Sequence, residues 1–392
     1  MPAATYEAVP EKRLLIACAR TRMTSSAASQ IREIACKPLR WEYLLQTAAE
    51  NSILPLLAAH LPAVVPDAFS SEQFAQLKAA ARAAGIRSLQ LSAELIRVLD
   101  ALGSHDILAL PYKGPVVAMQ AYGDLALREF EDLDIIVSQR DMARANKVLL
   151  ALNYQARSPW LFDSGALVPG EYKYVDAGRR LIVELHTELT LRHFPVAPHL
   201  GEMSKHATAV TIGGHEVRTF GAEDTLILLC VHGSKDFWER ISWITDVSEF
   251  TQRVTGMNWQ RVFDRSQESK ATRMVVLGLA LASDLLSTPL PDEVLARIES
   301  DAMAVTLARQ IAQRLVADDR SGRTATQSFR YRRQMVPGAV DSWRYGLRLA
   351  TAPAEEDWTM VHLPRALAPL YFVFRPFRLF RKYGVTQQKT GT

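Results

Sequence analysis

Cysteine is scarce in this sequence of 392 residues, which contains only Cys18, Cys36 and Cys230, all far apart. An odd number of isolated cysteines suggests neither a disulfide framework nor a zinc site. Disulfides are rare in the reducing cytoplasm, where we expect the protein to be located.

Long apolar runs and the pattern of a signal peptide are also missing. The longest apolar run, Met274 to Ala282, is too short to span a bilayer, so we expect no transmembrane segment. The first thirteen residues, MPAATYEAVPEKR, lack the basic-then-apolar order of a signal peptide.

Several familiar enzyme motifs are absent. The sequence has no GxGxxG, no Ser-His-Asp order and no Walker A motif, which is the commonest way to bind a nucleoside triphosphate. The formal net charge of +4 is too small to indicate nucleic-acid binding by the whole chain. A content of 48% hydrophobic and 22% charged residues is ordinary for a globular protein of two or three domains.

Acidic residues are absent from Trp358 to the C-terminus, whereas basic residues recur there. Residues Ala366 to Val385 alternate aromatic and basic side chains. This pattern predicts a basic surface that binds an anionic partner or a membrane face. The alternative is a terminal helix whose aromatic residues pack on the core and whose arginines are solvated.

The most informative stretch runs from Ile107 to Leu149. Its first part is a strand-like apolar run that ends at Lys113-Gly114-Pro115. Gly114 allows close approach of the backbone to a ligand, and Pro115 suits the first turn of a helix. The N–H groups of such a helix start can hold a phosphate, so we expect Lys113 and Gly114 to bind phosphate.

Asp132 and Asp134 follow in the β-rich run DLDIIV. Because they are two residues apart, both carboxylates project from one face of a strand. Adjacent carboxylates repel each other unless a cation lies between them, and Mg²⁺ shared with substrate phosphates fits this role. The alternative is an edge strand with two solvated acids.

A second pair of strands is predicted on either side of Ala177-Gly178, over 171–176 and 180–186. Glu184 and His186 share one face there. A carboxylate on an interior strand needs a partner, so Glu184 is predicted to be a third metal ligand, unless it faces solvent. His186 is either a hydrogen-bonded structural residue or a residue of the substrate cleft.

The segment from Ala222 to Phe237 predicts an apolar helix that ends in His232, Lys235 and Asp236. Spacings of three and four place these side chains on one side of the helix. They line the nucleotide or acceptor cleft in one interpretation, and form an ion-pair cluster at the helix end in the other.

These motifs, taken in order, resemble a known family. Lys113-Gly114, Tyr122-Gly123-Asp124, Arg128 and Asp132-Leu133-Asp134 are similar to the uncharacterised nucleotidyltransferase family of bacteria, a branch of the DNA polymerase β-like superfamily. Glu184-Leu185-His186 and the later His, Lys and Trp positions extend the resemblance. The chain departs from the superfamily in having Lys-Gly where Gly-Ser is usual.

The resemblance implies transfer of a nucleoside monophosphate from a nucleoside triphosphate (NTP) to an acceptor hydroxyl, with release of pyrophosphate. Two Mg²⁺ ions would be held by Asp132, Asp134 and Glu184, with Glu184 also accepting the proton. The nucleotide would be bound by Lys113, Gly114, Arg128 and Lys235, with His186 and His232 as further candidates for the substrate cleft. A catalytically silent nucleotide-binding or scaffold protein and a phosphoryl transferase on the same fold are the alternatives.

The expected fold class is α+β. We expect a small mixed sheet in a core at 106–220, between a helical region at 1–105 and a helical region with the basic tail at 221–392. Within the flanks, the sequence predicts a Ser/Ala-rich link up to about Ala28 and an exposed loop from Ala317 to Gly338.

Overall fold

The computed structural model describes residues 9–158, 170–176, 178, 180–189, 200–317 and 323–335, with scattered residues between 338 and 378. The predicted C-terminal tail lies for the most part outside these residues. Among the helices that are described, none is both long and apolar enough to cross a membrane.

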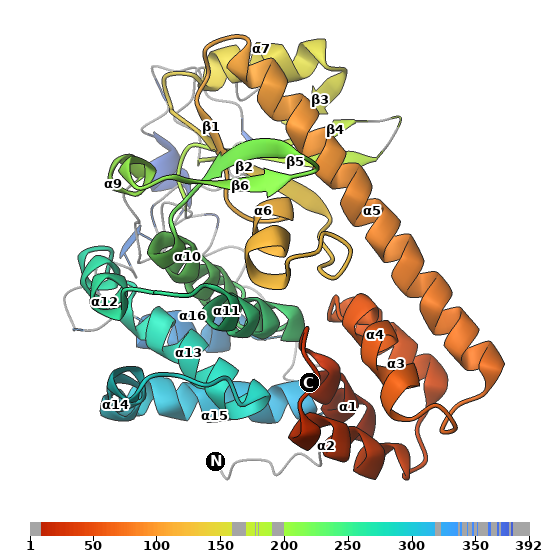
Figure 1. Cartoon of the computed structure of the whole chain (residues 1–392). Helices are drawn as coiled ribbons and strands as arrows, with labels where there is room; N and C mark the ends of the chain where they lie inside the picture. The colour runs from red at the N-terminus through yellow and green to blue at the C-terminus, as the bar shows by residue number, and fades with distance from the viewer. Residues whose placement is uncertain are drawn as a thin grey trace, which may run out of the picture.

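In the part of the chain that the structure describes, five helices precede the sheet. They are α1 (Pro10–Cys18), α2 (Ser25–Ala35), α3 (Trp41–Glu50), α4 (Leu54–Val64) and α5 (Ser71–Gly103). Ser70 and Gln73 form a capping box at the start of α5, which runs from the N-terminal helices to the sheet (Figure 1). Its buried residues, among them Leu91, Leu95 and Val98, join the main hydrophobic core.

A five-stranded mixed sheet follows, with strand order β1-β2-β5-β4-β3. Strands β2 and β5 are parallel, and the other neighbouring pairs are antiparallel. The strands are β1 (Ala109–Pro111), β2 (Asp132–Val137), β3 (Tyr154–Ala156), β4 (Glu171–Asp176) and β5 (Leu181–His186). A small sheet with helices before and after it is the α+β fold that the sequence predicted.

Short elements connect these strands. They are α6 (Pro115–Val117), the π-helical turn η1 (Ala118–Tyr122) and α7 (Met142–Ala151). After α9 (Leu200–Lys205), a separate hairpin pairs β6 (Thr208–Ile212) with β7 (His215–Thr219). Gly213 and Gly214 both have positive φ at its turn, as a tight two-residue hairpin connection requires.

The two faces of β2 have different surroundings. Leu133, Ile135 and Val137 are fully buried in the main core, which also contains Val148 and Leu149 of α7. The alternate residues point to the other face, as the period of two predicts. This face carries the carboxylates toward the C-terminal helices.

The C-terminal region is helical. It contains α10 (Ala222–Lys235), α11 (Ile241–Arg253), α12 (Trp259–Glu268), α13 (Thr272–Leu286), α14 (Asp292–Ser300), α15 (Ala302–Val316) and α16 (Ala325–Gln334). Helices α10, α11 and α15 all pack against the apolar α13, so this bundle is built around α13 (Figure 1).

Two segments that the sequence predicted to be non-helical contain helices in the structure. Helix α2 begins inside the expected link, because Thr24 caps its start and Ile31 and Ile34 are buried. Helix α16 lies inside the expected loop, and Thr324 and Gln327 form its capping box. In both segments the cap and a few buried apolar residues outweigh a polar composition.

Candidate active site

A cavity of about 350 Å³ lies between the sheet, α5 and the helices α10 and α11. This volume is within the range of small-molecule sites. All nine residues that the sequence singled out line it: Lys113, Gly114, Arg128, Asp132, Asp134, Glu184, His186, His232 and Lys235.

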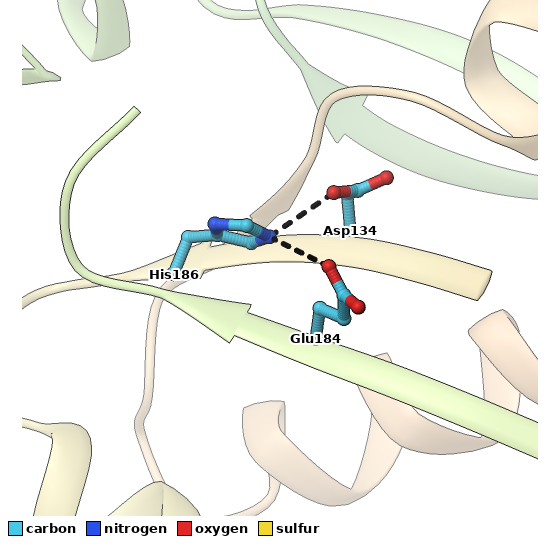
Figure 2. A group of neighbouring side chains, drawn as sticks. All are labelled: Asp134, Glu184 and His186. Carbon is cyan, nitrogen blue, oxygen red and sulfur yellow. Dashed lines mark hydrogen bonds and ion pairs between the residues drawn. The ribbon is translucent and has the colours of Figure 1, made fainter. Parts of the chain in front are cut away.

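The strand register brings the central group together. Asp134 is the partner of Glu184 across the parallel strands β2 and β5, and Ile136 is the partner of His186. Ligand atoms of Asp134, Glu184 and His186 all lie within 4.8 Å of one another, and Figure 2 shows the side chains converging. All three residues are buried, so this group has the spacing and the donor atoms to hold a metal ion.

Asp132 lies one step away on the same strand face, where its partner is Ile182. The predicted ligand set was Asp132, Asp134 and Glu184. In the structure, His186 takes the place of Asp132 in the group of three ligand atoms that lie within 4.8 Å of one another, while Asp132 lines the same cavity.

Cationic groups of the chain itself contact the two central carboxylates. Asp134 Oδ1 accepts hydrogen bonds from Lys113 Nζ at 2.9 Å and from His186 Nε2 at 3.0 Å. Glu184 is ion-paired with Lys173 of β4, which is its partner in the strand register. A metal ion would therefore have to compete with Lys113 and Lys173 for these oxygens.

Burial and crowding shift the two Asp carboxyls in opposite directions. Burial opposes ionisation of Asp134, but Lys113 and His186 outweigh it and hold the pKa of Asp134 well below its usual range. Burial, together with the charges of Asp134 and Glu184, raises the pKa of Asp132 to about 6. Repulsion of this kind is relieved by a cation, so the carboxylates present fit a divalent metal.

The turn at Gly114 has a backbone conformation that favours glycine. Its φ of 54° and ψ of −123° lie where a side chain is disfavoured. The helix that follows is short: α6 contains three residues before the chain changes to η1. Pro115 contributes no N–H to it.

The arrangement of His232, Lys235 and Asp236 at the end of α10 fits both a cleft lining and an ion-pair cluster. His232 and Lys235 line the cavity. They also contact Asp236, whose Oδ2 lies 3.2 Å from His232 Nδ1 and 3.8 Å from Lys235 Nζ. Burial and the nearby charges of Lys113 and Lys235 lower the pKa of His232 well below its usual range, so its imidazole is neutral.

Some lining residues were not predicted as site residues. Glu129, Arg240 and Trp243 line the cavity, together with Arg87 and Ser88 of α5. Lys173, which does not line the cavity, lies opposite Glu184 because Asp176 pairs with Leu181, a register that the predicted turn at Ala177-Gly178 did not give. Arg240 stands at the start of α11, and no local pattern in the sequence marks its approach to the cavity.

The fold and the cavity define an α+β protein whose sheet carries an acidic cluster suited to a divalent cation. Residues 37–287, more than half of the chain, match the family model described as uncharacterised nucleotidyltransferase, and the chain belongs to this family.

Among solved structures, one similar chain is that of an antigenic nucleotidyltransferase-like protein from Paracoccidioides brasiliensis. It is 16% identical, with a TM-score of 0.32, over 54% of this chain and 97% of that one. No curated protein matches the chain.

Proposed function

We propose that this protein transfers a nucleoside monophosphate from an NTP to an acceptor hydroxyl and releases pyrophosphate. The observation that carries the proposal is the pairing of Asp134 with Glu184, with Asp132 on the same face of one cavity. Membership in a nucleotidyltransferase family supports the reaction class.

Asp132, Asp134 and Glu184 are the proposed ligands of two Mg²⁺ ions. Carboxylate oxygens are the ligands that Mg²⁺ prefers, and these three line one wall of the cavity. Mg²⁺ bound there would lower the pKa of the attacking hydroxyl and neutralise charge on the triphosphate. His186 donates to Asp134 and thereby fixes the orientation of that carboxylate.

The remaining residues act on the substrate directly. Lys113, Arg128 and Lys235 supply positive charge to the triphosphate, and the Gly114 turn lets the backbone approach it closely. Glu184 accepts the proton of the acceptor hydroxyl. The acceptor oxygen then forms a bond to the α-phosphorus, and the bond from that phosphorus to the pyrophosphate oxygen breaks.

The products distinguish this reaction from its alternatives. The purified chain is incubated with a cell lysate and with NTPs that carry isotopic label at either the α- or the γ-phosphate, and products are identified by mass spectrometry. We expect α-label on an acceptor and γ-label in pyrophosphate. Label transferred from the γ-position, with release of a nucleoside diphosphate, would instead identify a phosphoryl transferase, and binding without any product would identify a silent binding protein.

A further inference from the structure

Arg128 is 9% exposed and lies in the wall of the cavity. Two of its three guanidinium nitrogens are used by one partner: Nε and Nη2 donate to Asp246 Oδ1 and Oδ2, both at 2.8 Å. The third nitrogen, Nη1, is buried and has no hydrogen-bond partner. A buried charged donor without an acceptor is costly, so this nitrogen is suited to an acceptor that arrives with a ligand.

Asp246 fixes the direction of that free nitrogen. It is 1% exposed on α11, and its Oδ1 also accepts a hydrogen bond from Tyr122 Oη at 2.8 Å. A planar guanidinium held at two nitrogens by one carboxylate cannot turn. The orientation of Nη1 is therefore set by residues that do not themselves line the cavity.

The surroundings of Arg128 favour a phosphate oxygen as the missing acceptor. Arg128, Lys113 and Lys235 all line the cavity, and the charges of all three depress the pKa of His232. The imidazole of His232 is neutral, so Lys113, Arg128 and Lys235 supply the cationic donors of this part of the cavity. Arg with a planar, donor-rich guanidinium is well matched to phosphate.

We propose that Asp246 is a positioning residue, which aims Nη1 of Arg128 at a phosphate of the bound NTP. This inference rests on the proposed function and adds to it a contribution from α11, whose carboxylate does not touch the substrate. In this arrangement the helical C-terminal region sets the geometry of triphosphate binding on the sheet.

Another buried Arg–Asp pair in the chain provides a matched control. Arg265 Nε lies 2.8 Å from Asp224 Oδ1, and Asp224 is 2% exposed. Neither residue lines the cavity. Asp224→Asn therefore removes a comparable buried charge without altering the donor that faces the ligand.

The test compares Asp246→Asn with Asp224→Asn. Binding of inorganic pyrophosphate is measured by isothermal titration calorimetry, and the KM for NTP and kcat are measured wherever turnover is found. We expect Asp246→Asn to raise both the pyrophosphate Kd and the KM by at least about tenfold, which is about 1.4 kcal/mol, with a smaller change in kcat. Asp224→Asn should leave both constants near wild type.

Two further variants keep the test decisive if Asp246→Asn does not fold. Tyr122→Phe removes one hydrogen bond to Asp246, and a several-fold rise in the pyrophosphate Kd supports the proposal. Arg128→Lys retains the charge but lacks Nη1, and it should weaken pyrophosphate binding as much as Asp246→Asn does. The proposal is overturned if Asp246→Asn, or Tyr122→Phe in its place, binds pyrophosphate as tightly as Asp224→Asn.

Pyrophosphate binding is measured without turnover, so it separates this inference from the proposed reaction. Binding that depends on Asp246, in a chain that transfers no label, would retain the positioning role and refute nucleotidyl transfer. Transfer of the α-label, with a pyrophosphate affinity that does not depend on Asp246, would support nucleotidyl transfer and refute the positioning role.

Discussion

Asp134 on β2 lies directly opposite Glu184 on β5, because these two strands run parallel in a register that pairs them. Each carboxylate has its own cation from the chain, Lys113 for Asp134 and Lys173 for Glu184. The site is thus charge-compensated within the protein. A divalent cation and these lysines compete for the same oxygens, so binding of the cation requires release of the lysines.

The two Asp residues of the DLDIIV strand should differ in their contribution to stability. Asp134→Asn leaves the half-buried Lys113 without its carboxylate partner, so we expect the free energy of unfolding to fall by about 3 kcal/mol. Asp132→Asn should instead leave stability unchanged or raise it at pH 8. Its pKa is raised to about 6, so the ionised form of Asp132 is disfavoured in the folded state at that pH.

Urea unfolding of both variants at pH 8, in buffer free of divalent ions, measures this difference. Equal losses of stability in the two variants would contradict the conclusion that Lys113 and His186 stabilise the ionised form of Asp134 in particular.

Replacement of Lys113 should strengthen binding of the metal ion and weaken binding of the triphosphate. Lys113→Met removes the competitor at Asp134, so we expect Mg²⁺ or Mn²⁺ alone to bind more tightly, by about tenfold. The same change removes a positive charge from the cavity, so the KM for NTP should rise. Isothermal titration with the metal alone and steady-state kinetics measure the two effects.

Lys173→Met is the matched control, because Lys173 pairs with Glu184 and does not line the cavity. It should strengthen metal binding without raising the KM for NTP. An unchanged KM in Lys113→Met would mean that the Gly114 turn holds the triphosphate through its backbone alone.

Glu129 should make stability depend on pH. Burial raises its pKa to about 7, although its carboxylate accepts a hydrogen bond from the Leu54 backbone N–H at 3.0 Å. An acid with a raised pKa binds more protons in the folded than in the unfolded state between about pH 4.5 and 7, so its contribution to stability falls as pH rises through that window.

Glu129→Gln keeps an acceptor for Leu54 and removes the charge. We expect this variant to be more stable than wild type at pH 8, by up to about 3 kcal/mol, and the two to converge near pH 4.5. A stability difference that is the same at both pH values would contradict this account.

Gly233 should tolerate no larger residue. A Cβ at this position would meet the ring of the fully buried Trp238 at 2.5 Å. Overpacking of this kind costs about 1–3 kcal/mol, so Gly233→Ala should lower the Tm. Gly103→Ala is the control: a Cβ there meets nothing within 4 Å, and reduced entropy of the unfolded chain should leave stability equal or slightly higher.

Local patterns were sufficient to predict the strand that carries Asp132 and Asp134 and the hairpin that carries Glu184. Successive side chains of a strand point to opposite faces, so the spacing of residues within each predicted strand determines which side chains share a face. These relationships depend only on neighbouring residues, so the sequence reveals them.

Long-range register could not be predicted in this way. Strands β2 and β5 are joined by a connection that includes α7, β3 and β4, and no local signal shows that Asp134 rather than Asp132 lies opposite Glu184. The approach of His186 to Asp134 depends on that register. The contact between Arg128 and Asp246 likewise joins residues 118 positions apart.

Pyrophosphate release by Asp134→Asn tests the central claim most directly. Once the acceptor has been found, wild type and variant are compared at saturating NTP and Mg²⁺, with Glu184→Gln beside them and folding checked by circular dichroism. We predict that Asp134→Asn loses activity by at least about a hundredfold, the scale expected when a key electrostatic group is removed. Glu184→Gln should bind NTP as wild type does but release pyrophosphate far more slowly. Mg²⁺-dependent release from Asp134→Asn at near the wild-type rate would contradict the account.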